Sequence, residues 1–348
     1  MQADRKGANP AQVRPVTIVD LARETGLSIA SVSYALNGKP GVSEATRARV
    51  LKSAELAGWA PNQAARALQA KRSNAIGLVI RRDKPEQPMR SDFIYRFLDG
   101  INDQLVDRPE SLLLRTVNSV EAEVETHRNW VTQGKVDALV IINLLAGEDP
   151  RLALVEELGV PTLTAGDIRG HKFVASVWTD DEEAMQLIVD HLISRGHRKM
   201  ARMRAPGNLR HLALRDAVFA RLLAEAGLPP ALYVTATVDG CDSTRAQISD
   251  LLAGEDPPSV LQYDNTLQAA EALKALQQLG VAVPEQCSVI SWEDTPFCET
   301  TQPSLTAIDR SAFAYGLAVG RQALNLIDTG SAEDTCGMTS HLIVRGST

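Results

Sequence analysis

From residue 74 onwards, short apolar runs alternate with stretches of helical periodicity, and this alternation constrains the fold more than any other feature of the chain. Apolar runs of this length, bounded by polar segments, predict strands. Amphipathic stretches such as 182–195 and 267–279 lie between most of them and predict helices. Alternating strands and helices form a parallel sheet with helices on both faces, and so many strands suit two doubly wound lobes better than one. The predicted strands are residues 75–80, 111–114, 138–142, 162–165, 174–177, 232–235, 260–262 and 288–291.

The segment before residue 60 has three short helical stretches, each preceded by a side chain that can cap a helix. Thr17 precedes the first, which Gly26 can end in the left-handed conformation that glycine favours. Ser28 precedes the second, which ends at Asn37, and Ser43 precedes a third that runs to residue 58. Two short helices joined by a tight turn predict a helix-turn-helix. A small helical bundle without a DNA-binding role has the same spacing, so both interpretations remain open on this pattern.

Charge is divided unevenly along the chain, which carries a net charge of −7 as a whole. Residues 1–72 carry a net charge of +6, and the remaining residues carry −13. Such a division is typical of a basic nucleic-acid module joined to an acidic body. Aromatic residues make up only 4% of the chain, which argues against stacking platforms for single-stranded nucleic acid. The basic segment is therefore expected to bind double-stranded DNA.

The second helix of this segment begins with Ser28, Ile29, Ala30 and Ser31. In a helix-turn-helix, the N-terminal residues of the second helix face the bases in the major groove. The hydroxyls of Ser28 and Ser31 can donate to phosphate oxygens, and the helix N-terminus adds backbone N–H groups and the positive end of a dipole.

Residues 16–68 resemble the DNA-binding headpiece of the lactose-repressor (LacI/GalR) family of transcriptional regulators. The resemblance rests on ordered motifs, which are VTIVDLA at 16–22, GLS at 26–28, VSYALN at 32–37, VSEATRARV at 42–50 and GWAPN at 58–62. It implies a homodimer that binds a palindromic operator in double-stranded DNA. The residues that it implies for DNA contact are Thr17, Ser28, Ile29, Ala30, Ser31, Tyr34, Asn37 and Leu68.

Three positions in this set depart from the family pattern, and the resemblance assigns all three to base contacts. Tyr34 stands where the family often has Arg, and Ile29 and Ala30 stand where it has polar residues. Ile29 and Ala30 cannot form bidentate hydrogen bonds and can only pack against thymine methyl groups or exclude them. We therefore expect an operator unlike the usual family sites. Packing of Ile29 into the headpiece core is the alternative.

Pro61 begins a further helical stretch that resembles the family's hinge helix. A helix of about ten residues is marginally stable alone, so its order can depend on DNA and on a second copy. Leu68 matches the family's minor-groove wedge, a side chain that kinks the duplex between base steps. Ordinary linker packing is the alternative for Leu68. The expected organisation is a disordered extension at 1–15, a helix-turn-helix domain at 16–60, a hinge helix and linker at 61–73, and a two-lobed effector-binding and dimerisation domain at 74–348.

The remainder of the chain resembles the family's effector domain, which is built like a periplasmic sugar-binding protein. Motifs that carry this resemblance include IGLVI at 76–80, GKVDALVI at 134–141, HLISRGHRKMA at 191–201 and PSLTAI at 303–308. Ligands of such folds bind between the lobes, at the carboxyl ends of the strands. The resemblance implies an effector site formed by Asp92, Phe93, Arg215, Asn265 and Glu293.

These groups suit a carbohydrate, because an arginine fork, an amide and carboxylates all bind hydroxyl groups. Departures from the family pattern leave the identity of the sugar open: Val218 replaces a glycine, Thr266 an aspartate, and Gly240 an aromatic residue. A surface ion pair of small energetic value is the alternative role for Arg215 and for Glu293.

Patterns for catalysis and metal binding are weak in this sequence, which has no GxSxG, P-loop or GxGxxG motif. His191 and His197 flank a turn and are interpreted as a helix-end and surface pair. The acidic run at 180–183 is interpreted as the N-terminal turn of a helix. No cofactor and no metal are therefore expected. An enzyme on an α/β scaffold and a sugar-transport binding protein are the alternative functions.

We therefore predict a sequence-specific transcriptional regulator, acting as a repressor, whose operator affinity depends on a bound small molecule. No apolar run reaches the length of about 18 residues that a membrane helix needs. The polar start of the chain lacks the apolar core of a secretory signal, so a cytoplasmic location is expected. The four cysteines are expected to be reduced thiols, mostly buried.

Overall fold

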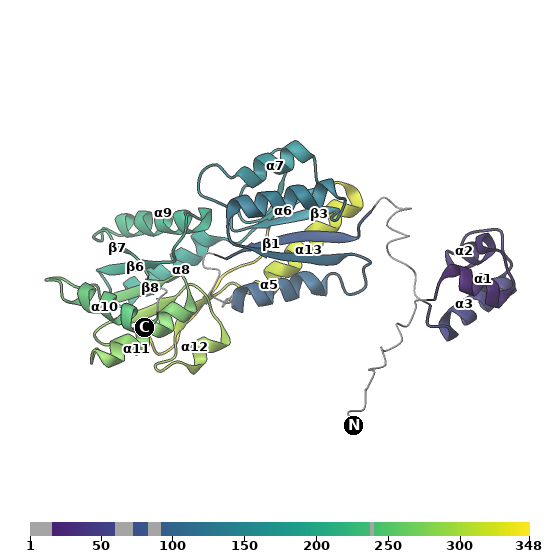
Figure 1. The fold of residues 1–348 in the computed structure, drawn as a ribbon. Helices are drawn as coiled ribbons and strands as arrows, with labels where there is room; N and C mark the ends of the chain where they lie inside the picture. Colours follow the sequence, from purple (N-terminus) through teal and green to yellow (C-terminus); the bar gives the residue numbers. More distant parts are fainter. Residues whose placement is uncertain (1–15, 60–71, 83–91, 237–239) are drawn as a thin grey trace, which may run out of the picture. The chain divides into compact units, whose positions relative to one another are not determined.

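The computed structural model describes residues 16–59, 72–82, 92–236 and 240–348 (Figure 1). The chain divides into two compact units, residues 1–71 and 72–348. We call residues 16–59 the headpiece and residues 72–348 the two-lobed unit.

The headpiece is formed by three helices, α1 (Ile18–Thr25), α2 (Ile29–Leu36) and α3 (Glu44–Leu56). Apolar side chains from all three helices meet in one core, in which Leu21, Val32 and Val50 are fully buried. A single small cluster of this kind holds short helices that would be marginal in isolation.

Each headpiece helix begins at the cap that the sequence predicted. The Thr17 hydroxyl accepts a hydrogen bond from the Asp20 backbone N–H at 3.3 Å, and the Asp20 carboxylate accepts one from the Thr17 backbone N–H at 2.9 Å. The hydroxyls of Ser28 and Ser43 likewise accept a backbone N–H three residues later. Gly26 ends α1 with a φ of 67°, a conformation that glycine adopts without steric cost. The tight turn between α1 and α2 is thus confirmed.

The two-lobed unit contains two six-stranded sheets, one in each lobe. The N-lobe sheet has the strand order β11-β5-β4-β3-β1-β2, and its neighbouring strands are parallel. Its strands are β1 (Ala75–Arg81), β2 (Ser111–Val117), β3 (Ala138–Ile142), β4 (Thr162–Ala165), β5 (Ala175–Trp178) and β11 (Thr335–Cys336).

The C-lobe sheet has the strand order β12-β10-β9-β8-β6-β7. All its pairings are parallel except that of β12, which runs antiparallel to β10. The predicted fold, a helical headpiece joined to two parallel α/β lobes, is confirmed. The C-lobe strands are β6 (Met200–Arg204), β7 (Leu232–Thr235), β8 (Val260–Tyr263), β9 (Ser288–Ser291), β10 (Thr306–Asp309) and β12 (His341–Ile343).

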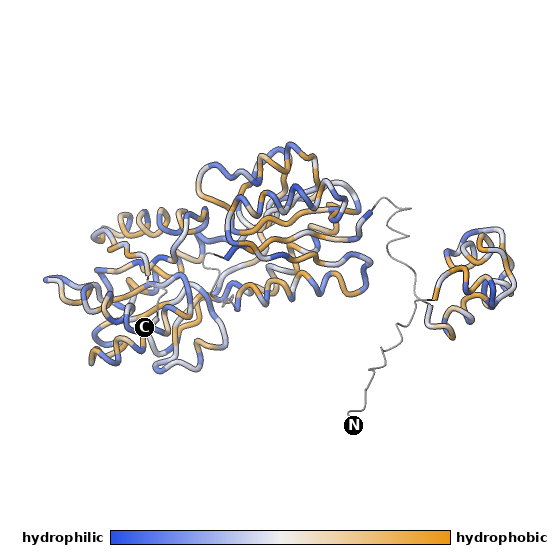
Figure 2. Tube along the Cα trace, viewed as in Figure 1, coloured by the Kyte–Doolittle hydropathy of each residue, from blue (hydrophilic) through white to orange (hydrophobic). Residues whose placement is uncertain are grey.

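Helices cover the sheets of both lobes, and strand and helix side chains form two buried apolar clusters in each lobe (Figure 1). Figure 2 shows hydrophobic residues concentrated along the N-lobe strands. The N-lobe helices are α5 (Asp92–Asp103), α6 (Val120–Thr132), α7 (Pro150–Leu158) and α13 (Ala312–Thr329). The C-lobe helices are α8 (Asp181–Ser194), α9 (Arg210–Glu225), α10 (Cys241–Leu252), α11 (Thr266–Gln278) and α12 (Pro296–Thr300).

The chain passes between the lobes three times, after β5, after β10 and after β11. Helix α13 and strand β11 therefore belong to the N-lobe, although C-lobe segments precede and follow them in the sequence. Two lobes that are joined by three segments can move relative to one another only as those segments bend together.

Four strands, β6, β10, β11 and β12, were not predicted from the sequence. Strand β6 contains Arg202, which is fully buried and lies 3.1 Å from Asp216 and 2.7 Å from Asp264. Buried parallel strands are recognised in a sequence as continuous apolar runs. A charged residue interrupts such a run, so the strand is not recognised. Strands β11 and β12 have only two and three residues, which is too short for any periodicity to show.

Helices α5 and α13 approach each other closely at glycine positions. A Cβ atom on Gly100 would lie 2.1 Å from the carbonyl oxygen of Phe313, and one on Gly316 would lie 2.1 Å from the carbonyl oxygen of Phe97. Only residues without a side chain permit the two backbones to come this close. Because α13 also packs on β3, β4 and β5, this contact holds a late segment of the chain in the N-lobe core.

Gly316→Ala is expected to lower the free energy of unfolding by about 1–3 kcal/mol, because the added methyl group overpacks a backbone contact. Gly254→Ala is the matched control, since the nearest atom to a Cβ at that position is 3.8 Å away. Chemical denaturation followed by tryptophan fluorescence measures both variants. Equal unfolding midpoints would contradict the close packing of α5 on α13.

Candidate functional site

The exposed face of α2 carries the residues expected to contact bases. Ile29 is 51% exposed and Tyr34 is 44% exposed, and Ala30 beside them is exposed as well. The alternative in which Ile29 packs into the headpiece core is therefore wrong. The hydroxyls of Ser28 and Ser31 lie 2.9 Å apart at the N-terminus of the same helix, where first-turn N–H groups have no partner within the helix. Apolar and hydroxyl groups thus share the N-terminal turn of α2, and the aromatic Tyr34 is exposed further along the helix.

The other headpiece residues predicted for DNA contact have partners within the headpiece. The Thr17 hydroxyl donates to the Asp20 carboxylate at 2.6 Å, and the Asn37 amide donates to the Ser33 carbonyl oxygen at 2.9 Å. Both side chains therefore stabilise helix ends in this structure. Leu68, the predicted wedge, lies outside the described residues.

A cavity of about 750 Å³ lies between the two lobes. Its lining comes from the carboxyl ends of β1, β3, β4 and β5 and from segments that follow β6, β8, β9 and β10. Ligands of doubly wound folds bind at this edge of the sheets, and small-molecule sites have volumes of about 300–1,000 Å³. Four of the five predicted effector residues, Phe93, Arg215, Asn265 and Glu293, line the cavity. The fifth, Asp92, lines an adjoining pocket of about 20 Å³.

Arg215 is buried in the cavity wall, at 5% exposure. Its Nε donates to Asp181 at 2.7 Å, and its Nη1 lies 3.5 Å from Asp264. The guanidinium also stacks on the ring of Trp292, with 4.1 Å between Cζ and the ring centroid, which adds a cation–π attraction. The alternative role of Arg215 as a surface ion pair is therefore wrong.

Arg310 was not predicted as a site residue, yet it lines both the cavity and the adjoining pocket. It is 7% exposed, and its Cζ lies 5.2 Å from the Phe93 ring centroid. Its polar neighbours are distant: Thr179 Oγ1 at 3.4 Å, Asp181 at 3.6 Å and Glu293 at 3.9 Å. Its Nε has no hydrogen-bond partner among the described residues. A buried guanidinium that uses so few of its N–H groups can donate further hydrogen bonds to a ligand.

Asp181 corrects the interpretation of the acidic run at 180–183. Asp180 is the N-cap of α8 and accepts two backbone N–H groups, as expected of an acid at a helix start. The Asp181 side chain is 5% exposed and binds Arg215 and Arg310 in the cavity wall instead. Burial raises the pKa of Asp181, but the two arginines lower it by more, so this pKa lies below its ordinary value. Asp181 is therefore ionised at neutral pH.

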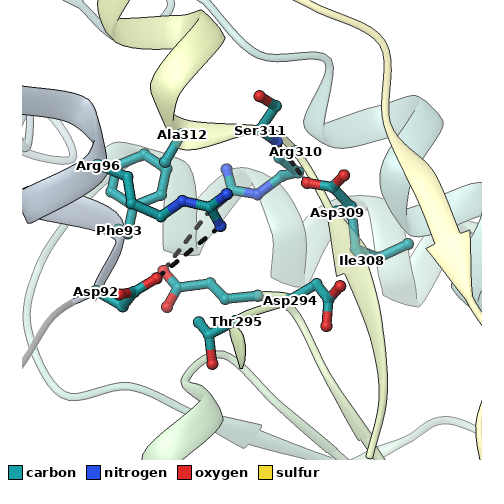
Figure 3. A pocket seen from close by; sticks show the side chains of 11 residues that line it. Asp92, Phe93, Arg96, Asp294, Thr295, Ile308, Asp309, Arg310, Ser311 and Ala312 are labelled. Carbon is teal, nitrogen blue, oxygen red and sulfur yellow. Dashed lines mark hydrogen bonds and ion pairs between the residues drawn. The ribbon is translucent and has the colours of Figure 1, made fainter. Parts of the chain in front are cut away.

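The remaining predicted effector residues lie in the walls of the cavity or of the adjoining small pocket. Figure 3 shows Asp92 and Phe93 from the start of α5 on one side of the small pocket and Arg310 from the segment before α13 on the other. Burial raises the pKa of Glu293, and Arg310 opposes that shift. The Asn265 side-chain oxygen caps α11 by accepting two backbone N–H groups. This cap fixes the amide at the cavity wall.

His191 and His197 lie close to hydroxyl groups. His191 Nε2 lies 2.8 Å from Thr348 Oγ1, and His197 Nδ1 lies 2.8 Å from Ser259 Oγ. Burial and the charge of a nearby arginine lower the pKa of His211, which lines the cavity, to about 3, so this imidazole is neutral at neutral pH. Within the described ranges, no group of three or more His, Cys, Asp or Glu side chains is arranged to hold a metal ion. Nor does that part of the chain contain a helix that is long and apolar enough to cross a membrane.

Comparisons with known proteins identify both units. Residues 17–62 match the lacI family of bacterial regulatory proteins, and residues 189–348 match a periplasmic binding protein-like domain. The HTH-type transcriptional regulator AglR of Rhizobium meliloti (strain 1021) is 30% identical over 343 residues, which cover 96% of this chain and 94% of AglR. Catabolite control protein A of Priestia megaterium is 26% identical over 94% of this chain and 97% of that protein.

Solved structures have the same fold. A LacI family transcriptional regulator from Bifidobacterium animalis subsp. lactis superposes with a TM-score of 0.71 at 31% identity, covering 80% of this chain and 98% of that chain. The lac repressor dimer bound to operator and an anti-inducer gives a TM-score of 0.83 at 23% identity, over 96% and 99% of the two chains. At that identity, the second likeness concerns the fold alone.

A helix-turn-helix headpiece and a two-lobed unit of the periplasmic-binding type define a DNA-binding transcriptional regulator with an effector domain. The chain belongs to the LacI family. The members of this family are transcriptional regulators and not enzymes, so the enzyme alternative is wrong.

Asp181→Ala is expected to lower the free energy of unfolding by about 3–5 kcal/mol, because it leaves the buried Arg215 and Arg310 without their shared anion. Asp180→Ala is the matched control, since it removes only a helix cap, worth about 1 kcal/mol. Thermal unfolding of the two variants measures the difference. Equal losses would return Asp181 to the role of an ordinary acid at a helix start.

Proposed function

We propose that the protein is a repressor that binds a palindromic operator as a homodimer, and that its operator affinity changes when a carbohydrate occupies the cavity between the lobes. The observation that carries this proposal is the composition of the cavity of about 750 Å³, whose wall combines guanidinium, carboxylate and amide groups with aromatic rings. The transcriptional regulator CelR, solved in complex with cellobiose, lends support: it is 24% identical with a TM-score of 0.69, over 96% of this chain and 100% of that chain.

The chemistry of a polyhydroxyl ligand matches that of the cavity wall. Each hydroxyl group both donates and accepts, so adjacent hydroxyls can accept from Arg310 and donate to Asp181 or Glu293. Phe93 and Trp178 line the same cavity and offer apolar faces to the C–H groups of a sugar ring. We therefore propose Arg310 and Asp181 as ligand contacts in addition to the predicted residues.

The headpiece supplies the proposed contacts with DNA. Ile29 and Ala30 are exposed at the start of α2, where a recognition helix meets the major groove, and Tyr34 is exposed further along the same helix. Ser28 and Ser31 are proposed to bind phosphate oxygens beside them. The sequence further supports the domain division proposed above, with the helix-turn-helix at 16–60, the hinge helix and linker at 61–73 and the effector domain at 74–348. Within this hinge helix, Leu68 is proposed to wedge into the minor groove.

Coupling between the two sites follows from the position of the cavity. A ligand that binds both walls favours one relative arrangement of the lobes, and in a dimer this changes the spacing of the two hinge helices. The headpieces then gain or lose register on a two-fold symmetric operator. Couplings of this type amount to about 1–3 kcal/mol in operator affinity.

Selection from a random pool of duplex DNA, with purified protein at near-physiological salt, is expected to recover one palindrome. A panel of sugars added to the same selection is expected to contain one that weakens or strengthens binding.

Tyr34→Ala should lower the affinity for the selected operator by about tenfold or more, since a base contact is worth about 1–3 kcal/mol. Leu51→Ala is the control, because Leu51 is 48% exposed on α3 and lies outside the proposed contact set. Recovery of no preferred sequence, or equal losses in the two variants, would contradict base contact by α2.

Arg215→Lys is expected to raise the sugar concentration needed for the operator response by about tenfold, while sugar-free operator affinity changes less than about twofold. Lysine keeps a cation between the two buried aspartates but loses the planar fork. Arg221→Lys, on the exposed side of the same helix, is the matched control and should respond as wild type does. Titration of operator binding with the selected sugar measures both. An unchanged response in Arg215→Lys would remove Arg215 from the effector site.

A further inference from the structure

The two lobes touch through their main chains at a place distant in sequence from the three crossings. Leu145, in the N-lobe loop between β3 and α7, forms an antiparallel bridge with Leu209, which precedes α9 in the C-lobe. The Arg210 N–H donates to the Leu144 carbonyl oxygen at 2.8 Å, and the Ala146 N–H donates to the Asn208 carbonyl oxygen at 3.1 Å. The Asn208 side-chain amide adds a contact to the Ala146 carbonyl oxygen at 3.3 Å.

This contact lies at the effector cavity. Leu144, Leu209 and Arg210 all line the cavity, so the paired segments are part of both of its walls. Main-chain pairing fixes the distance and the register of the segments that it joins. The width of the cavity at this edge is therefore set by the pairing of residues 144–146 with residues 208–210.

The N-lobe half of the contact is shaped from behind by Arg151, which is fully buried. Its Nη1 donates to the Ile142 carbonyl oxygen and its Nη2 to the Asn143 carbonyl oxygen, both at 2.9 Å. Asn143 has a φ of 51°, in the left-handed region that asparagine adopts more readily than most residues with a side chain. The Asp149 carboxylate binds Arg151 and also accepts the Leu145 N–H at 3.0 Å. Arg151 thus holds the turn that brings Leu144 and Leu145 to the other lobe.

Arg151 is also connected, through Glu123, to a second part of the cavity wall. Glu123 is 1% exposed and lies 2.8 Å from Arg151 and 3.1 Å from Arg81. Arg81 ends β1 and lines the cavity. A change at Arg151 therefore acts on both β1 and the loop after β3 without touching the cavity itself.

We propose that residues 144–146 and 208–210 form a clasp between the lobes that positions the cavity walls before a ligand binds, and that Arg151 is its positioning residue. The importance of the clasp for effector binding rests on the function proposed above, whereas the clasp itself can be measured without any effector. Two main-chain hydrogen bonds are a weak barrier, so the clasp can open and close as ligands enter and leave.

The position of Arg210 allows one clasp bond to be removed cleanly. Arg210 is the first residue of α9, where proline is favoured because the N–H has no partner within the helix. Leu209 has φ −105° and ψ 139°, the extended conformation that a residue before proline prefers. Arg210→Pro therefore deletes the bond to Leu144 while keeping the helix start. Arg210→Ala is the matched control, because it removes the same side chain and keeps the N–H.

The test is amide hydrogen exchange of the full-length, ligand-free protein. Exchange at Ala146 should be about two- to tenfold faster in Arg210→Pro than in Arg210→Ala, the loss expected for one hydrogen bond. Peptides that contain β8 serve as the internal reference for global unfolding. Equal Ala146 exchange in the two variants, after correction for that reference, would overturn the clasp.

A second pair of variants tests Arg151. Arg151→Lys should also accelerate exchange at Ala146, because one ammonium group cannot hold both carbonyl oxygens of the turn. Arg128→Lys, at an exposed ion pair with Glu157 on neighbouring helices, should not. Wild-type exchange at Ala146 in Arg151→Lys would refute its positioning role. If Arg151→Lys does not fold, the Arg210 pair still decides whether the clasp exists. Failure of every sugar to alter operator binding would contradict the proposed function and leave the clasp result standing.

Discussion

Two of the segments that join the lobes meet at the buried ion pairs that Asp181 forms with Arg215 and Arg310. Asp181 follows the first crossing of the chain between the lobes, and Arg310 lies within the second. Thr179, on the first crossing segment, is a further neighbour of Arg310 at 3.4 Å. The pairs therefore tie two of the three connecting segments to each other and to α9. Bending of these two segments against each other would change the distance between Asp181 and Arg310, whereas the pair of Asp181 with Arg215 lies within the C-lobe.

The buried charges of this site have short hydrogen bonds behind the cavity wall, around Asp264, and only long ones at the cavity, around Arg310. At the rear, the Asp264 carboxylate accepts from Arg202 at 2.7 Å and from the Ala205 N–H at 3.0 Å. At the cavity, Arg310 has only distant partners. Burying charges costs stability unless their hydrogen bonds are made, and replacing buried ion pairs in proteins with well-packed apolar side chains is often neutral or stabilising. A polar binding site requires charged groups that are held firmly from behind and that keep unused donors on the cavity side. A ligand then supplies the missing hydrogen-bond partners.

The sequence predicted those parts of the molecule that depend on local pattern. Caps at Thr17 and Ser28 and the turn at Gly26 are set by interactions within four residues, so they could be recognised without a structure. The alternation of apolar runs and helices likewise fixed the two-lobed class. Strand β6 was missed because the cost of placing Arg202 in a sheet is offset by partners on other elements, which a single run of residues does not reveal.

The candidate site was predicted in part, for a related reason. Phe93, Arg215, Asn265 and Glu293 all line the cavity, as the family resemblance implied. Asp181 was assigned to a helix start because acids are favoured there, and only its distant partners distinguish it from Asp180. Arg310 directly follows β10, and ligands bind at the carboxyl ends of parallel strands. That rule would have found it had β10 been recognised.

Strand β1 is the shortest covalent path between the cavity and the chain that leads to the headpiece. Arg81 at its end lines the cavity, and at its start the backbone N–H groups of Ser73 and Asn74 donate to the Asp137 carboxylate at 2.8 and 2.7 Å. Arg72 also donates to the Ile327 carbonyl oxygen on α13 at 3.1 Å. These bonds fix residues 72–74 to the N-lobe. Any rotation of the N-lobe would therefore carry residues 72–74 with it, because their hydrogen bonds join them to α13 and to the chain just before β3.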